Sequence, residues 1–367
     1  MLLLGMGLLL SVLGVLLKRN NVLYLIQLTF LWVVASFNNS NPDYINYING
    51  YKYSDTYTGK ITEPLYWVLV KIGKTIGLNY QMFRCLFFLL CIMILGYGIW
   101  KMANYPNCVV GLYFVYPFAM DVIQMRTFFA NSLVIAAICF VSKYREENRL
   151  EDFIISVVLM AGGVGFHYSA ALCFIVYLLL LDWERPIEQM IKIGTIILSG
   201  IVFFLLWGGR VYEHLVTIGV FNKANQYQEK GLSFGGYAIS VIALRILLIM
   251  LCFLALHMPK IISEENRIII SRNTFFAKCV YLLSIYAAFE VTVSLEMERV
   301  SRISLILTYS IITNIVEIGE KKNSLILYIM MFVFVAFNFY FMMFRHFSTG
   351  SNWFHFSFLP VFVNNIL

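Results

Sequence analysis

Long apolar segments, separated by short charged connectors, fill most of this sequence. A transmembrane helix needs about 20 predominantly apolar residues, within a range of roughly 17 to 25. By this criterion the chain has about 12 candidate spans, several of them short. The sequence therefore predicts an all-α, polytopic integral membrane protein. The candidate spans cover residues 1–17, 22–37, 82–100, 107–121, 127–142, 152–167, 169–182, 192–208, 237–257, 274–294, 303–317 and 324–343.

The amino-acid composition supports the same fold class. Hydrophobic residues make up 60% of the 367 positions and charged residues only 13%, whereas a soluble domain carries about 25% charged residues. Such a chain has too little polar surface for a water-facing exterior, so lipid must surround most of it. Residues 1–17 have no basic stretch before them and no small-residue cleavage site after them. We therefore expect a retained first helix rather than a signal peptide.

No linker or internal repeat divides the sequence, so we expect a single transmembrane domain over residues 1–367. Polar loops are predicted near 38–81 and 209–236, and a polar tail over 345–367. Within the first loop, residues 64–78 are expected to form an amphipathic interfacial helix or a re-entrant segment. With an external N-terminus, all three polar regions would lie outside the cytoplasm. Lysine and arginine are equally numerous on the two sides, but the inside connectors are shorter, and this density favours the orientation.

The first candidate site residues lie in the loop near 38–81. Asp43 is followed by Tyr44 and Tyr47, and a carboxylate beside aromatic rings suits a sugar, because it accepts hydroxyl hydrogen bonds while a ring covers the C–H face. The alternative is a belt of tyrosines at the membrane interface. Glu63 precedes Pro64 at a predicted helix start, where it either acts as a general base or merely complements the helix dipole.

Arg126 is the strongest single candidate, because a charged residue at membrane depth is costly. Gln124, Thr127 and Asn131 share one helical face, and Arg126 points roughly opposite Gln124, so the arginine needs a partner of its own. A guanidinium in this position can bind a diphosphate through two hydrogen bonds. The alternatives are an ion pair with Asp121 and a side chain that extends to the membrane edge.

Further candidates follow the later spans. His167, between two spans, can move a proton or neutralise a phosphate, or it is only a hydrogen-bonded structural residue. Arg299 and Arg302 share a helical face and predict an anion site, although Glu298 offers Arg302 a salt bridge on a solvated face. Arg245 lies inside a span and is a weaker candidate for the same cavity.

Several function classes are disfavoured by missing motifs. The sequence has no phosphate-binding glycine loop, no HExxH and no CxxC pair, and its seven cysteines lie mostly in apolar segments. No carboxylate pair of the DxD kind is present to hold a nucleotide–metal complex. We therefore expect neither a metal nor a cofactor, and neither nucleotide-sugar transfer nor ATP-driven work. The net charge of +7 is ascribed to loops that face anionic lipid rather than to nucleic-acid binding.

Taken in chain order, these motifs resemble the EpsG family of bacterial membrane proteins, relatives of the Wzy polysaccharide polymerases. The resemblance extends over nearly the whole chain. The family often has Gln after the central arginine and Gly after the glutamate, where this chain has Thr127 and Pro64. The motifs are Asp43-Tyr44-x-x-Tyr47, Glu63-Pro64, Gln124-Met125-Arg126-x-x-x-Ala130-Asn131-Ser132, Phe166-His167-x-Ser169-Ala170 and Arg299-x-x-Arg302.

The resemblance implies a function and a fold. Such proteins join oligosaccharide repeat units carried on undecaprenyl diphosphate at the outer face of the bacterial cytoplasmic membrane. The growing chain moves from its lipid diphosphate to a hydroxyl of the incoming unit. The fold is all-helical and similar to that of metal-independent, GT-C-like membrane glycosyltransferases. The implied partners are the lipid-linked oligosaccharide as donor and acceptor, membrane lipid, a chain-length regulator and a flippase, and no nucleic acid.

The resemblance also suggests a role for each candidate residue. Arg126, Arg299 and Arg302 would hold diphosphate oxygens, and His167 would bind phosphate or move the proton. Asp43 and Glu63 are the base candidates. Tyr44 and Tyr47 would stack on sugars, and Gln124 and Arg245 would also contact the substrate. Two other functions stay open from the sequence: a lipid-linked oligosaccharide flippase or transporter, and a transferase that adds a single sugar from a polyprenyl phosphate. Product length distinguishes them, because only a polymerase yields a ladder.

Overall fold

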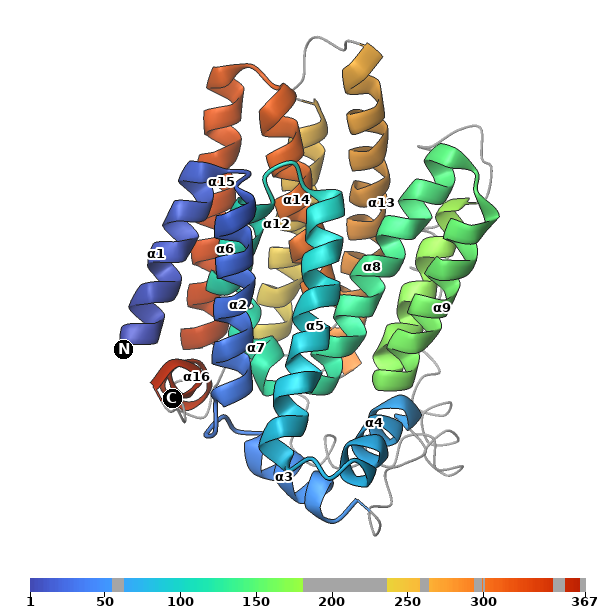
Figure 1. Ribbon diagram of the computed structural model, residues 1–367. Helices are drawn as coiled ribbons and strands as arrows, with labels where there is room; N and C mark the ends of the chain where they lie inside the picture. Colours follow the sequence, from blue (N-terminus) through green and yellow to red (C-terminus); the bar gives the residue numbers. More distant parts are fainter. Residues whose placement is uncertain are drawn as a thin grey trace.

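Nearly parallel helices form the body of the protein in the computed structural model, with two shorter helices, α3 and α4, at one end (Figure 1). The structure describes residues 1–54, 63–180, 236–257, 264–293, 299, 301–345 and 354–363. Every secondary-structure element in this part of the chain is a helix. The all-α fold class is therefore confirmed. The predicted loop near 209–236 lies outside the described residues, apart from Gly236, where α12 begins.

The elements follow the order of the predicted apolar segments, with α3 and α4 inside the first polar loop. The α-helices are α1 (Leu2–Leu17), α2 (Asn21–Phe37), α3 (Tyr44–Lys52), α4 (Pro64–Thr75), α5 (Tyr80–Met102), α6 (Pro106–Val115), α7 (Phe118–Ile123), α8 (Met125–Glu147), α9 (Leu150–Phe166), α12 (Gly236–His257), α13 (Glu264–Val293), α14 (Ser301–Ile318), α15 (Lys321–Tyr340) and α16 (Leu359–Val363). A 3₁₀-helix, η2 (Tyr168–Leu180), follows α9, and two short π-helical turns, η4 (Phe341–Arg345) and η5 (Phe354–Phe358), precede α16.

Five of the described helices are long and apolar enough to cross a membrane. They are Tyr80–Met102, Met125–Glu147, Asn266–Ile285, Ser301–Ile318 and Lys322–Tyr340. Shorter apolar helices accompany them at Leu2–Leu17, Asn21–Phe37, Pro106–Val115, Ser169–Leu180 and Ile242–His257. The architecture is that of a multi-pass membrane protein. The number of about 12 spans stays a prediction, and its segment 192–208 lies outside the described residues.

Two predicted spans differ in form from the structure. The segment 107–121 is not one helix, because α6 ends at Val115 and α7 begins after Pro117, whose ring and missing N–H interrupt a helix. Ten helical residues in α6 extend only about 15 Å, against roughly 30 Å of bilayer core. The described part of the segment 169–182 lies in the 3₁₀-helix Tyr168–Leu180, which extends about 26 Å at 2.0 Å per residue.

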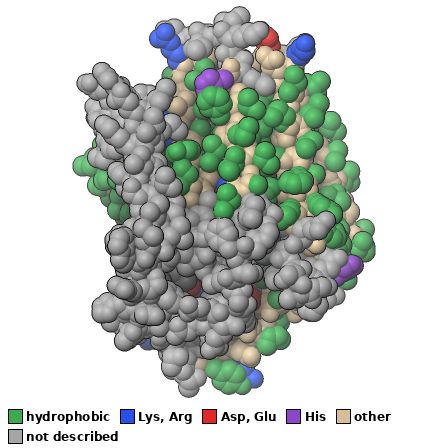
Figure 2. Space-filling model, turned by 180° about the vertical axis from the view of Figure 1, so that it is seen from behind, with side chains coloured by type: hydrophobic (Ala, Val, Ile, Leu, Met, Phe, Trp, Pro, Cys, Tyr) green, Lys and Arg blue, Asp and Glu red, His purple; other side chains and the backbone are tan. Residues whose placement is uncertain are grey.

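The outer helices present apolar stripes to the surroundings. On α5 and on α15, large hydrophobic side chains spaced three or four residues apart are exposed, as expected for helices that face lipid. Figure 2 shows such side chains over most of the height of the visible described surface, with Lys and Arg at its upper rim. This distribution fits a bilayer around the middle of the molecule. The stripes are Met82, Leu86, Leu90 and Met93 on α5, and Leu325, Ile329, Val333 and Phe337 on α15.

Small residues bring α1 and α6 into close contact. A Cβ added to Gly14 would lie 2.4 Å from the carbonyl oxygen of Asn107, and one added to Gly111 would lie 2.9 Å from the Cα of Ser11. The backbones therefore approach too closely for larger side chains, as is common where helices pack in membranes. Gln27 of α2 completes this contact, because its Nε2 donates to the carbonyl of Asn107 at 3.1 Å.

Helix α14 forms the centre of the bundle, and its residues from Ser301 to Val316 are all buried. The hydroxyls of Thr308 and Ser310 donate to carbonyls one turn earlier at 2.8 and 2.9 Å, which satisfies them without water. Near the other end of the helix, the Nδ2 of Asn314 donates to the carbonyl of Met102 at 2.8 Å. These bonds fix the helix whose beginning carries part of the candidate site.

Candidate functional site

Ionisable side chains from four separate helix ends meet at the end of the molecule that carries α3 and α4, which we call the α3–α4 end. Glu63 immediately precedes α4, Arg126 lies in the first turn of α8, His167 follows α9, and Arg299 precedes α14. Each was a candidate from the sequence, and the family resemblance implied that they act together on one diphosphate. We call these four residues the Glu63 cluster.

Glu63 and Arg126 form an ion pair, Nη1 of the arginine donating to Oε2 of the glutamate. The side chain of Glu63 is only 5% exposed, whereas that of Arg126 is 24% exposed. The Glu63 side chain does not cap the N-terminus of α4, which Pro64 opens. The partner of Arg126 is therefore Glu63, not the Asp121 that the sequence offered as an alternative.

His167 connects the carboxylate to a second guanidinium. Its Nε2 lies 3.7 Å from Oε1 of Glu63 and 3.3 Å from Nη1 of Arg299. On the other side of the ring, Nδ1 lies 2.7 Å from the hydroxyl of Ser169 and accepts the backbone N–H of that residue at 3.3 Å. Asn131 of α8 fixes the backbone next to the cluster, because its Nδ2 donates to the carbonyl of Arg299 at 3.1 Å. The Phe-His-x-Ser and Ala-Asn-Ser motifs thus meet in space.

Two tyrosine rings support the guanidinium of Arg126. Its Cζ lies 5.4 Å from the ring centroid of Tyr47 and 5.6 Å from that of Tyr66, within the range of cation–π attraction. Burial raises the pKa of Tyr66, on α4, well above its usual value. This phenol therefore stays protonated and is not a base near neutral pH. Tyr66 was not identified from the sequence, because its position beside Arg126 depends on how α4 docks.

Arg302 belongs to a second, more deeply buried contact set. Its Nη1 donates to Oδ1 of Asp121 and its Nη2 to Oε1 of Gln124. The other carboxylate oxygen of Asp121 accepts the hydroxyl of Tyr113 at 2.8 Å. The side chains of Arg302 and Asp121 are 5% and 3% exposed. These bonds join the beginning of α14 to α6, to α7 and to the residue between α7 and α8. Arg302 and Gln124 therefore anchor the beginning of α14.

Both contact sets lie within a part of the chain that matches a known family. The model of the EpsG family matches residues 21–358, which is nearly the whole sequence. The chain belongs to the EpsG family. No curated protein and no solved structure matches it.

In this EpsG-family chain, the remaining candidates lie around the two contact sets. Arg245 of α12 is buried, and its Nη2 donates to the hydroxyl of Ser301 at 2.6 Å, one residue before Arg302. Asp43 directly precedes α3, and its carbonyl accepts the N–H of Tyr47 at 3.0 Å. Tyr47, in α3, is the residue of this motif whose ring contacts the guanidinium of Arg126.

Arg84 is a buried arginine that the sequence did not single out. Its Nε and Nη2 donate to the carbonyl of Ala35 at 3.1 and 2.9 Å, and its Cζ lies 5.3 Å from the ring of Tyr44. Arg84, on α5, thus satisfies a carbonyl in the last turn of α2 and contacts the first residue of α3. The available signal was a charged residue at the start of an apolar segment. Tyr44 is thus related to the Glu63 cluster through its helix, rather than by contact with Arg126.

The Glu63 cluster consists of guanidinium, imidazole and carboxylate groups. Among the described residues, no group of three or more His, Cys, Asp or Glu side chains lies together in a way that could hold a metal ion. What the cluster offers chemically is one carboxylate beside a guanidinium and a histidine, with a second guanidinium next to the same histidine. Such an arrangement can bind an anion and exchange a proton within a few ångströms.

Proposed function

We propose that this protein is a polysaccharide polymerase of the bacterial cytoplasmic membrane. It would join undecaprenyl-diphosphate-linked oligosaccharide repeat units by glycosyl transfer to a sugar hydroxyl at the outer face. EpsG-type proteins are Wzy-like polymerases, and membership of the family points to polysaccharide polymerisation or a related function. The observation that carries the proposal is the convergence of Arg126, Glu63, His167 and Arg299 from four helix ends.

The two cationic arginines of the cluster would bind the donor diphosphate. As the bond between the anomeric carbon and the diphosphate oxygen breaks, negative charge accumulates on the leaving group. Nη1 of Arg126 holds Glu63, and its Nε is buried without a hydrogen-bond partner among the described residues. The guanidinium thus retains donor capacity for phosphate oxygens. The rings of Tyr47 and Tyr66 fix the orientation of the guanidinium and hence the direction in which its N–H groups point.

Glu63 is the base that the geometry favours. A new bond forms between the acceptor oxygen and the anomeric carbon, and the acceptor hydroxyl loses its proton. The Glu63 carboxylate is buried beside the guanidinium of Arg126, and His167 stands 3.7 Å away to receive or return the proton. Asp43 directly precedes α3 and is not one of the four residues of the Glu63 cluster, so we assign it to contacts with the acceptor sugar. Tyr44 on the same helix would support that sugar.

Arg302, Gln124 and Arg245 would serve the reaction indirectly. Their bonds fix the beginning of α14, from which the chain reaches Arg299. This role differs from the sequence hypothesis, in which Arg302 held diphosphate oxygens directly. The predicted likeness to metal-independent, GT-C-like glycosyltransferases and the predicted regulator and flippase partners stay predictions.

The test is turnover of a defined undecaprenyl-diphosphate-linked repeat by the purified protein in detergent or vesicles. A polymerase yields a ladder of products that differ by one repeat unit. A single step of one added sugar would identify a single-addition transferase instead. Lipid-linked repeats that cross the vesicle membrane without any elongation would identify a flippase and end the proposal.

A further inference from the structure

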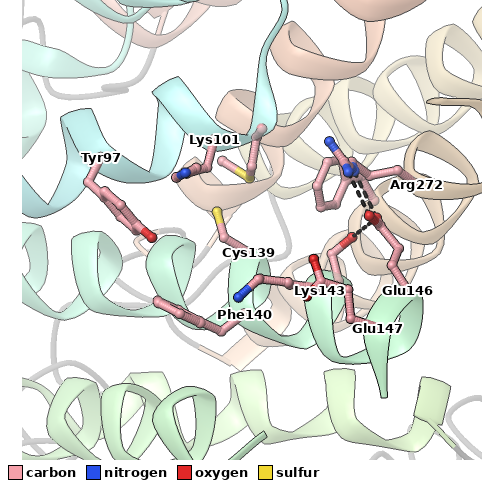
Figure 3. Close-up of a pocket in the computed structure, with 11 residues that line it drawn as sticks. Tyr97, Lys101, Cys139, Phe140, Lys143, Glu146, Glu147 and Arg272 are labelled. Carbon is pink, nitrogen blue, oxygen red and sulfur yellow. Dashed lines mark hydrogen bonds and ion pairs between the residues drawn. The ribbon is translucent and has the colours of Figure 1, made fainter. Parts of the chain in front are cut away.

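A cavity of about 310 Å³ lies at the end of the molecule opposite the Glu63 cluster, between α5, α8 and the beginning of α13. Figure 3 shows Tyr97 and Lys101 on one side of it, with Lys143, Glu146 and Arg272 across from them. The function proposed above uses none of these residues. The orientation predicted from the sequence places these helix ends on the cytoplasmic side.

The cavity is continuous with the lipid-facing surface of α5. The exposed stripe of that helix runs through Leu90 and Met93 and continues with Tyr97 and Lys101 at spacings of three or four residues. The ring of Tyr97, which is 45% exposed, stacks on Phe140 of α8 with 6.2 Å between the centroids. An apolar stripe that ends in an aromatic pair and a lysine is the arrangement expected where a helix leaves the bilayer core. The cavity therefore lies at headgroup depth.

The cations around the cavity differ in how far they are neutralised. Arg272 is held by Glu146 through two bonds of 2.8 and 2.6 Å, and Lys143 is held by Asp152 at 2.9 Å. No ion pair of Lys101 is found among the described residues, and its Nζ lies 5.8 Å from the ring centroid of Tyr97. The side chain of Lys143 is 42% exposed, so it can also reach a second anion. Lys101 thus leaves a positive charge uncompensated beside a lipid-facing cavity.

We propose that this cavity binds the phosphate headgroup of an anionic phospholipid. The ammonium groups of Lys101 and Lys143 would donate to the phosphate oxygens, and the Tyr97–Phe140 pair would cover the glycerol region. The acyl chains would run along Met93 and Leu90 of α5. Because α5, α8 and α13 all line the cavity, a bound lipid would join three helices at the membrane edge. The inference does not depend on the polymerase reaction.

The test is lipid retention by the full-length protein, measured by native mass spectrometry after reconstitution in phosphatidylcholine with added phosphatidylglycerol. Wild-type protein is expected to retain phosphatidylglycerol in preference to phosphatidylcholine. The double variant Lys101→Gln/Lys143→Gln is expected to retain it roughly tenfold less, because each lysine near the surface contributes to anionic lipid attraction. The double variant Lys101→Arg/Lys143→Arg keeps both charges and should retain the lipid, which separates charge from a folding defect.

Two controls decide the source and the place of binding. Lys71→Gln removes an exposed lysine from α4, at the α3–α4 end, and should leave retention unchanged. Inorganic phosphate, added together with phosphatidylglycerol at equal concentration, should not displace the lipid. Equal retention by the glutamine double variant, an equal loss in Lys71→Gln, or full competition by inorganic phosphate would each overturn the proposal.

Discussion

Nε2 of His167 lies 3.7 Å from Oε1 of Glu63, while Oε2 of the same glutamate accepts a hydrogen bond from Arg126. One buried carboxylate is thus shared between an imidazole and a guanidinium that come from different helices. Removing the carboxylate charge would affect both neighbours. Single substitutions can separate the chemistry of this cluster from the packing that supports it.

Glu63→Gln is expected to lower polymer formation by about 100-fold or more, the range in which general acid–base groups act. The amide keeps the size of the side chain but cannot take a proton from the acceptor hydroxyl. The measurement is the rate of ladder formation from a defined lipid-linked repeat. Asp43→Asn removes the other base candidate; because Asp43 is assigned to the acceptor sugar, this variant should raise the KM for the acceptor and affect the turnover number much less. A wild-type rate in Glu63→Gln, with the loss of turnover in Asp43→Asn instead, would identify Asp43 as the base.

Ser169→Ala is expected to lower the turnover number a few-fold to about tenfold, the effect of losing one hydrogen bond. The Ser169 hydroxyl lies 2.7 Å from Nδ1 of His167 and orients the ring towards Glu63. Ser169→Thr retains the hydroxyl and should restore the rate. Steady-state kinetics on the same repeat unit measure both variants. An alanine variant as fast as the threonine variant would show that the ring is oriented by other contacts.

Asp121→Asn is expected to destabilise the protein by about 3–5 kcal/mol, because it leaves a buried guanidinium without its counter-charge. The Arg302–Asp121 pair joins the beginning of α14 to α7. Thermal unfolding in detergent measures the change. Arg149→Gln breaks the exposed pair with Glu147 and should not change the unfolding temperature measurably. Equal unfolding temperatures for Asp121→Asn and the wild type would refute the anchoring role.

Gly14→Ala is expected to destabilise the contact between α1 and α6 by about 1–3 kcal/mol, as overpacking does. The added methyl would lie 2.4 Å from the carbonyl oxygen of Asn107, in backbone that cannot move independently. Gly5→Ala is the control in the same helix, because a methyl group added there would have nothing within 4 Å. Unfolding temperatures of the two variants give the comparison. If both fall equally, the loss comes from glycine itself rather than from the close approach.

The sequence predicted the class of fold because apolar runs and scarce charge allow few alternatives. Periodicity also predicted that Arg126 and Gln124 point in different directions, and the structure gives them different partners, Glu63 and Arg302. Those partners could not be predicted, since a pairing between distant helix ends depends on how the helices pack. Composition alone likewise does not separate a 3₁₀-helix from an α-helix, so η2 was predicted as an ordinary span. Arg84 was missed because it was counted within an apolar segment.

The most direct test of the proposed reaction is turnover of one lipid-linked repeat by purified Arg126→Ala beside the wild-type protein. If the arginine binds the departing diphosphate, the variant should leave the single-repeat lipid unreacted while the wild type yields a ladder. Arg126→Lys should recover only part of the activity, because an ammonium group cannot make the paired hydrogen bonds of a guanidinium. A ladder of normal length from Arg126→Ala would contradict the proposed role of the Glu63 cluster.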